Sequence, residues 1–431
     1  MTIFTRDSHD IADVQACPEW IEQDTHVPAF TSADAAARYE MVDASAAHDE
    51  PALEAQWRGM LAAGHSPEKL YQTPAFFRYM QDAETAQPRS HALYLVRRRS
   101  DARVVAIVPV RHSRQEVAFG LGPLTLFRRT LASLQVLGSV PLLDRSEPGL
   151  AGFVMRSLLE REPACKVLSM QATPHAQLAA LRELDALAAR TLNGWRACHT
   201  LPLPETADAY LQKFSAKKRY NLARQVRLLA KEAGEVSLER VVDVDAVPGM
   251  IAAMNAVLPP AQFKALAQEA RIARLAKHGL LLSYVVRAGG QPAAVIIGTR
   301  SCDVWHVHNI CTAAAWHALS VGTSAVHLAV QDVIANFGFA DADFGYGTPN
   351  SEFRSTQVLK ERAHVLLAPA RSPAALLLAA HGAWHRVECA LAGKVKAWQR
   401  QREQRRRSAA AAAAAAVSTS ASASASAAAD A

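Results

Sequence analysis

Residues 305–354 place the tightest limits on how this chain can fold, because they predict a strand, a turn, a helix and a second strand in succession. Residues 305–310 are rich in β-branched and aromatic types, which indicates a buried strand. Ser320 then offers an N-cap oxygen, and apolar residues recur beyond it at helical spacing. Residues 340–344, bounded by glycines, predict the next strand. A strand, a turn of small residues and the free N–H groups of a helix start can bind phosphate or pyrophosphate, although a plain helix cap is the alternative interpretation.

An antiparallel meander is predicted to lead into this segment. Residues 280–287 and 292–300 are apolar runs joined by the sequence Ala-Gly-Gly-Gln, which is a good hairpin turn. Residues 301–303 turn the chain again into the strand that begins at Val304. The predicted order is therefore a meander, a phosphate-type turn, a helix and a further strand.

This order resembles the core of GNAT acyltransferases, and two short segments resemble motifs of the CelD-like and FemAB-like branch. Residues 215–222, S-A-K-K-R-Y-N-L, are similar to the S-x-K-x-R-x-N-L helix of that branch. Residues 343–347, D-F-G-Y-G, followed by Phe353 and Arg354, resemble its D-F-G-x-G and aromatic-basic pair. The resemblance covers residues 198–367 well and residues 51–190 loosely. It implies a mixed α/β (α+β) fold of two tandem GNAT-like units, each a mainly antiparallel central sheet flanked by helices.

Four segments are expected along the chain. Residues 1–50 lack sustained periodicity and predict a mobile leader. Residues 51–195 predict a degenerate GNAT-like domain, and residues 196–370 the GNAT-like acyltransferase domain. Residues 371–431 predict a basic helical tail that ends in Ala/Ser low complexity, expected to be dispensable for catalysis and stability.

The first half differs from the second at the turn that should bind phosphate. Residues 144–149 are acidic, and carboxylates at this point would repel a phosphate. The first half is therefore expected to serve as scaffold and acceptor-binding wall. Residues 177–192 predict a helix in this half, closed by Asn193 and Gly194.

The charge and the cysteines narrow the class of protein. The net charge is +7, but the sequence from His381 onward holds eight Lys/Arg and three Asp/Glu, which leaves about +2 for the rest. The folded part is therefore not expected to bind nucleic acid strongly. Six scattered cysteines without a C-x-x-C pair predict free thiols in a reducing compartment, and no stretch predicts a membrane span. A cytoplasmic protein is expected.

Acyl transfer from a thioester to an amine needs a deprotonated amine, both reactants in place, and a stabilised carbonyl oxygen and leaving thiolate. The resemblance implies that the strand at 305–310 offers backbone N–H groups to the pantetheine arm. His306 and His308 lie two residues apart, which predicts one face of that strand, and histidine titrates near neutral pH as a general base requires. Tyr346 could return a proton to the sulfur, and Asp343 could orient a lysine, an arginine or an amine. A purely structural role is the alternative for each of the four.

The remaining candidates would bind the two substrates. Those expected to contact acyl-CoA are Val307, Asn309, Ser320, Val321, Gly322 and Thr323. Those expected to contact the acceptor or a phosphate are Lys217, Arg219, Asn221 and Arg354, with a solvated basic face as the alternative. No metal site is predicted, because the histidine pair lacks a third ligand at a known spacing. Family members commonly carry Tyr-Asp after the fourth strand, and Cys311-Thr312 stands there in this chain.

The sequence thus predicts an acyl-CoA-dependent N-acyltransferase, with acetyl-CoA as the default donor and no permanently bound cofactor. The acceptor would be an amine on a small molecule or glycan precursor, in polysaccharide or cell-envelope biosynthesis. Two alternatives stay open. One is a FemAB-type aminoacyltransferase that uses aminoacyl-tRNA, which the near-neutral charge of the folded part disfavours. The other is a non-catalytic GNAT-like accessory protein.

Overall fold

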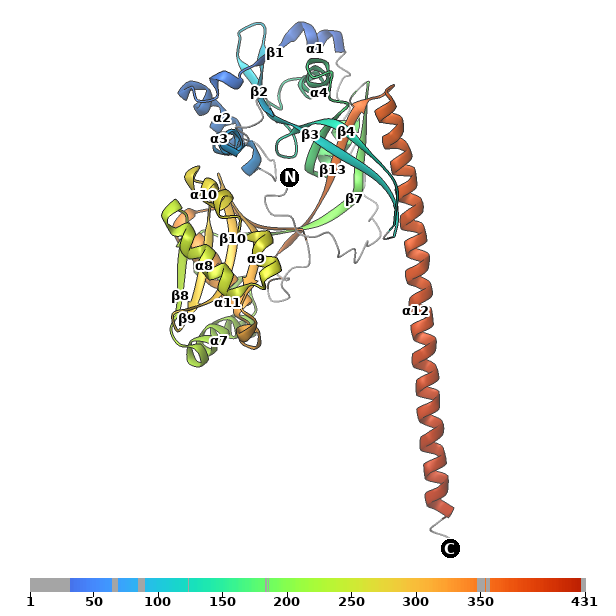
Figure 1. The fold of residues 1–431 in the computed structure, drawn as a ribbon. Helices are drawn as coiled ribbons and strands as arrows, with labels where there is room; N and C mark the ends of the chain where they lie inside the picture. Colours follow the sequence, from blue (N-terminus) through green and yellow to red (C-terminus); the bar gives the residue numbers. More distant parts are fainter. Residues whose placement is uncertain are drawn as a thin grey trace. The chain divides into compact units, whose positions relative to one another are not determined.

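The computed structural model describes residues 32–63, 69–83, 90–122, 124–182, 184, 186–346, 353 and 357–427. The chain divides into two compact units (Figure 1). The larger unit comprises residues 1–115 and 132–370, and the smaller unit comprises residues 116–131 and 371–431. The tandem arrangement predicted from the sequence lies in the larger unit.

The first half of the chain builds a meander, a crossover helix and two further strands. Its helices are α1 (Ser32–Arg38), α2 (Pro51–Ala63), α3 (Pro74–Ala83), α4 (Leu150–Arg161) and α5 (His175–Arg182), with 3₁₀ turns η1 (Ser45–Ala47) and η2 (Lys69–Gln72). Its strands are β1 (Tyr39–Asp43), β2 (His91–Arg98), β3 (Val104–Leu121), β4 (Leu124–Val136), β5 (Leu142–Leu143), β6 (Val167–Pro174) and β7 (Leu187–Pro202).

The second half repeats this order. Its helices are α6 (Ala207–Gln212), α7 (Ala216–Ala233), α8 (Val247–Val257), α9 (Pro260–Leu266), α10 (Glu269–Lys277) and α11 (Val321–Phe337), with η3 (Val244–Ala246) and η4 (Ala314–Leu319). Its strands are β8 (Val236–Val241), β9 (Ser283–Ala288), β10 (Gln291–Ser301), β11 (Val304–Thr312), β12 (Asp341–Tyr346) and β13 (Val358–Pro369), and α12 (Pro373–Ala427) follows.

Local sequence explains several of these boundaries. Ser215 caps α7, because its hydroxyl oxygen accepts the N–H of Lys218. The predicted hairpin between β9 and β10 is confirmed, and Gly289 and Gly290 form its turn with φ values of 56° and 77°. Both values lie in the left-handed region that glycine adopts without strain, as a two-residue hairpin turn requires.

The strands form one continuous sheet with the order β1-β2-β3-β4-β6-β13-β7-β12-β11-β10-β9-β8, and β5 pairs with β3. The strand order is the same when it is followed from either edge of the sheet: four strands of one half come first, and the strand after the crossover helix of that half comes next. In each half a meander ends in a strand that pairs parallel with the strand after the crossover helix, β4 with β6 and β11 with β12. The last strand of each half pairs with a strand of the other half: β7 pairs with β12, and β13 pairs with β6. The two halves therefore exchange a strand.

Two sequence expectations need correction in the first half. The leader expected over residues 1–50 includes α1 and β1, and β1 pairs with β2, while residues 1–31 lie outside the described residues. The helix expected over residues 177–192 ends at Arg182, and β7 begins at Leu187. Asn193 and Gly194 lie within β7 at a bulge opposite β13 rather than at a helix end. Pairing with β13 and β12 overrides the local helical pattern.

Three apolar clusters surround the sheet. One packs α6, α7 and α11 on one face of the second half, and another packs α1, α4 and α5 on the first half. The third is shared, because it joins α2 and α3 of the first half to α8 and α10 of the second. Lys69 reaches Asp303 with 2.9 Å between Nζ and Oδ2, which adds a polar contact between the halves. The shared core holds the two halves against one another.

The smaller unit consists of α12 and the tip of the β3–β4 hairpin. The indole N–H of Trp384 donates to the carbonyl of Gly120 at 2.6 Å, and the rings of Phe119 and His381 lie 5.4 Å apart. Leu378 and His381 are buried. The start of the tail is thus packed against the hairpin tip, while its dispensability from about Ser372 stays a prediction. Of the helices that the structure describes, none has the length and apolar character to cross a membrane.

Deleting residues 373–431 is expected to lower the melting temperature by roughly 5 °C, because it removes the cover of the hairpin tip. Deleting residues 394–431 should leave the melting temperature within about 2 °C, because the contacts of Trp384 and His381 remain. Differential scanning calorimetry of the two truncations measures both effects. Equal melting temperatures would show that the packing of α12 contributes nothing to stability.

Candidate active site

β11 and β12 separate part of the way along their length. They pair in parallel at Val304–Asp341, Trp305–Ala342 and His306–Asp343, and β11 then continues to Thr312. Beyond His306 no strand among the described residues pairs with this edge of β11. The backbone groups of such an edge need partners, and an extended ligand can supply them.

A bulge and a buried amide mark the open part of β11. Ile297 pairs with Asn309 and Gly298 with Val307, so His308 is the extra residue of a β-bulge. The Oδ1 atom of Asn309 is buried, and no donor within the described part of the chain reaches it. A buried acceptor without a donor costs free energy. Asn309 can therefore accept an N–H from a ligand that lies along this edge.

The chain passes from β11 through η4 into α11. Ser320 occupies the N-cap position, but its φ is 55° and its side chain makes no capping bond, so the N-cap oxygen expected from the sequence is not used. Val321, Gly322 and Thr323 form the first turn, whose N–H groups have no acceptor within the helix. The helix dipole adds positive potential at this end, which favours a phosphate. A Cβ on Gly322 would lie 3.2 Å from Cγ2 of Thr312, so the turn is closely packed there.

The two histidines of β11 are held by hydroxyl groups. Nε2 of His306 lies 3.0 Å from Oγ of Ser301, and Nε2 of His308 lies 2.8 Å from Oγ1 of Thr299. Burial lowers the pKa of His306 to about 4 and that of His308 to about 3. The expectation of a near-neutral pKa is therefore wrong. Both rings are neutral at pH 7 and can accept a proton, although as weak bases.

Asp343 is engaged by three groups of the chain. Its Oδ2 lies 2.8 Å from Nη1 of Arg362, and its Oδ1 accepts the N–H of Gly345 at 2.7 Å and the thiol of Cys198 at 3.3 Å. Burial alone would raise the pKa of Asp343, but the charge of Arg362 and these hydrogen bonds hold it below its usual value. The sequence suggested that Asp343 orients a lysine, an arginine or an amine, and its partner in the structure is Arg362 of the same chain. The pair joins β12 to β13, and the thiol joins β12 to β7.

The other candidates are distributed around this centre. Tyr346 ends β12, and the guanidinium of Arg196 lies 4.4 Å from the centroid of its ring. Lys217 is exposed on α7, Arg219 donates to the carbonyl of Phe214 at 2.8 Å, and Asn221 is half-buried. Arg354 lies outside the described residues.

The two sequence motifs of the predicted branch meet in space. The ring of Phe214, just before Ser215, lies 6.1 Å from that of Phe353, which is fully buried. α7 also packs along α11 and η4. The basic helix therefore lies beside the helix start that is expected to bind phosphate.

The turn before the equivalent helix of the first half holds a buried carboxylate. Glu147, two residues before the N-cap of α4, is buried and accepts a hydrogen bond from the hydroxyl of Tyr39 at 2.9 Å. Nη1 of Arg98 lies 2.7 Å from its Oε1. Burial and this carboxylate raise the pKa of Tyr39 to about 12. The turn expected to repel phosphate thus holds a buried negative charge.

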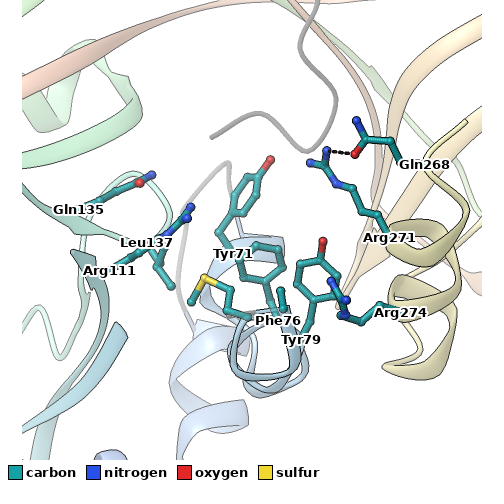
Figure 2. A pocket seen from close by; sticks show the side chains of 11 residues that line it. Tyr71, Phe76, Tyr79, Arg111, Gln135, Leu137, Gln268, Arg271 and Arg274 are labelled. Atoms are coloured by element: carbon teal, nitrogen blue, oxygen red, sulfur yellow. Dashed lines mark hydrogen bonds between the residues drawn. The ribbon is translucent and has the colours of Figure 1, made fainter. Parts of the chain in front are cut away.

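A cavity of about 310 Å³, which the sequence interpretation missed, lies between α3 and α10 (Figure 2). Its walls come from η2, α3, β3, β4 and α10, and they are Tyr71, Phe76, Tyr79, Met80, Ala83, Arg111, Gln135, Leu137, Gln268, Arg271 and Arg274. Tyr79 and Leu137 of its wall share a buried cluster with Cys311 of β11, so the cavity lies near the open part of β11. Residues so far apart in the sequence form no local motif, which is why no pattern indicated them.

Stability should fall as the pH is lowered from about 6.5 to about 4. Burial lowers the pKa of His306, His327 and His364 to about 4, against an ordinary value of 6.5. In this range the unfolded chain binds protons that the folded chain does not, which favours unfolding by about 1.4 kcal/mol per pH unit and group. Denaturant unfolding at pH 7 and pH 5 measures the loss.

A variant isolates one of these groups. His327→Gln removes a titrating ring that lies in α11 beside Tyr210. Between pH 7 and pH 5 it should lose about 2 kcal/mol less than the unaltered protein. An identical loss in both proteins would contradict the assignment of a low pKa to this histidine.

Comparison with known proteins identifies the segment around β11. Residues 216–354 match the family described as acetyltransferase (GNAT) domain. No curated protein matches the chain significantly. The structure is similar to the crystal structure of FemX, with a TM-score of 0.51 and 9% identity, over 73% of this chain and 95% of that one. It is also similar to a tandem GNAT protein from the clavulanic acid biosynthesis pathway, with a TM-score of 0.44 and 13% identity, over 78% of this chain and 99% of that one.

Proposed function

Because residues 216–354 are a GNAT acetyltransferase domain and the chain has the tandem fold of the FemAB-like branch, as the sequence predicted, we propose that it transfers an acyl group from acyl-CoA to an amine. Acetyl-CoA is the first donor to test. The observation that carries this proposal is the separation of β11 from β12 beyond His306, next to the start of α11. An extended thioester arm and a pyrophosphate need these two features side by side.

The donor would lie along β11 with its pyrophosphate on the first turn of α11. Backbone N–H groups of Val321, Gly322 and Thr323 would bind the phosphates. Val307 and Asn309 would face the pantetheine arm, with the buried Oδ1 of Asn309 accepting an amide N–H. Only one donor site is proposed, because the buried carboxylate of Glu147 lies at the corresponding helix start of the first half.

The amine nitrogen would attack the thioester carbonyl directly, with loss of one proton from nitrogen and departure of the thiolate. His308 is proposed to receive that proton, because it is the less buried of the two histidines and lies at the bulge in the open part of β11. Tyr346 is proposed to protonate the thiolate. Asp343 is a positioning residue in this scheme, since Arg362, Gly345 and Cys198 already occupy its oxygens.

Isothermal titration with CoA and acetyl-CoA tests the proposal on the full chain. We expect micromolar affinity, together with thiol release from acetyl-CoA when a panel of amines is supplied. His308→Ala should lower kcat by about 10²-fold or more while the affinity for CoA stays the same. Absence of CoA binding, combined with transfer that RNase abolishes, would replace this proposal with aminoacyl transfer from tRNA. CoA binding without thiol release would indicate a non-catalytic protein.

A further inference from the structure

We propose that the cavity between α3 and α10 binds the acceptor through an anionic group, so that the substrate is an amine that carries a phosphate or a carboxylate. The word "acceptor" rests on the function proposed above, but the binding of an anion in the cavity does not. The cavity volume of about 310 Å³ suits a molecule of the size of a sugar phosphate.

Three guanidinium groups line the cavity, and they come from both halves of the chain. Arg111 lies on β3, and Arg271 and Arg274 lie one turn apart on α10. Among the described residues that line the cavity, none is an aspartate or a glutamate. Arginine presents a planar fork of donors that matches phosphate and carboxylate oxygens. The lining therefore selects an anion by charge and by geometry.

The carboxylate at the end of α3 is paired with residues that do not line the cavity. Asp82, at the end of α3, lies 2.7 Å from both Nζ of Lys277 and Nε2 of His278. Within the described residues, Arg274 has no carboxylate in ion-pair distance. The positive charge of Arg274 is thus not balanced by a described carboxylate, and the contacts of Asp82 fix α3 against α10 beside the cavity.

The other wall of the cavity is aromatic. Phe76 and Tyr79 are buried with ring centroids 5.4 Å apart, and Tyr71 meets Phe76 edge to face at 5.0 Å. Figure 2 shows the hydroxyl of Tyr71 and the guanidinium of Arg271 extending into the same space, with Arg111 across from them. A hydrogen bond of 3.1 Å from Arg271 to Gln268 orients that guanidinium. Rings of this kind pack against the apolar face of a sugar or another flat body.

The position of the cavity connects it to the reaction. Phe76, Tyr79 and Leu137 of the cavity wall belong to the same buried cluster as Cys311, which lies in the open part of β11. An acceptor held by its anion between the arginines can therefore direct its amine toward the open edge of β11. Neither half could form this site alone, because β3 and β4 come from one half and α10 from the other.

Titration calorimetry with glucosamine 6-phosphate and with glucosamine tests the inference. The two probes share the ring and the amine, and only the first carries a phosphate. We expect the phosphorylated probe to bind at least about tenfold more tightly, and Arg274→Glu to remove that difference. Muramic acid, which carries a carboxylate on a lactyl ether of the same sugar, tests whether a carboxylate is bound as well as a phosphate. Lys264→Gln, at an exposed site on α9 outside the cavity, controls for a general change of charge and should bind all probes normally.

The inference fails if no anionic probe binds more tightly than glucosamine, or if Arg274→Glu binds the anionic probes as the unaltered protein does. Circular dichroism and the melting temperature confirm that the variant is folded, and Arg274→Gln provides a milder change of the same group. CoA affinity is measured on the same samples. If the unaltered protein binds CoA but shows no preference for the anionic probes, this inference alone is overturned. If the unaltered protein prefers the anionic probes but does not bind CoA, the proposed function alone is overturned.

Discussion

Gly322→Glu should weaken CoA binding by at least about 100-fold while the protein remains folded, which corresponds to about 2.7 kcal/mol. The residue lies in the first turn of α11, where N–H groups and the helix dipole favour an anion. A glutamate adds a negative charge and bulk at the position proposed for the pyrophosphate. Titration calorimetry with CoA measures the loss.

Gly322→Ala separates charge from bulk. The backbone at Gly322 does not have a positive φ, so alanine is compatible with it, and its Cβ would need a shift of Thr312 from 3.2 Å by a few tenths of an ångström. We expect this variant to keep CoA affinity within about tenfold. Unchanged affinity in Gly322→Glu would show that the pyrophosphate does not bind at α11.

Asp343→Asn should lower the free energy of unfolding by about 3 kcal/mol or more. The side chains of Asp343 and Arg362 are 6% and 4% exposed, and their closest atoms lie 2.8 Å apart. Replacing the carboxylate leaves a buried guanidinium without its charged neighbour. An unpaired charge in the protein interior raises the free energy of the folded state. Denaturant titration measures the change.

The double variant tests whether the two side chains act as a pair. Arg362→Met alone should also destabilise the protein, and Arg362→Met with Asp343→Asn should cost less than the sum of the two changes by about 1–3 kcal/mol. Additive effects would mean that the contact itself contributes little. A large loss of kcat in Asp343→Asn without any loss of stability would instead identify Asp343 as a catalytic residue.

The sequence determined the parts of the fold that depend on residues close together in the chain. The meander of β9, β10 and β11 and the order β11–α11–β12 follow from side-chain period and turn glycines. These signals act within a few residues, so they can be recognised without knowledge of the partners. The same signals led to the expected family.

Only the tertiary structure decided the rest, because it depends on which distant segments meet. β7 has a partly helical pattern and is a strand because β12 and β13 pair with it. The pKa values of His306 and His308 fall because neighbouring elements exclude water from them, which spacing along a strand cannot reveal. The arginine cavity is assembled from separate elements of both halves, and no segment of the sequence contains enough of it to be recognised. The periodicity of apolar residues and the residue types of a turn are local properties of the sequence. Strand pairing, the exclusion of water from buried histidines and the grouping of arginines depend on the folded chain.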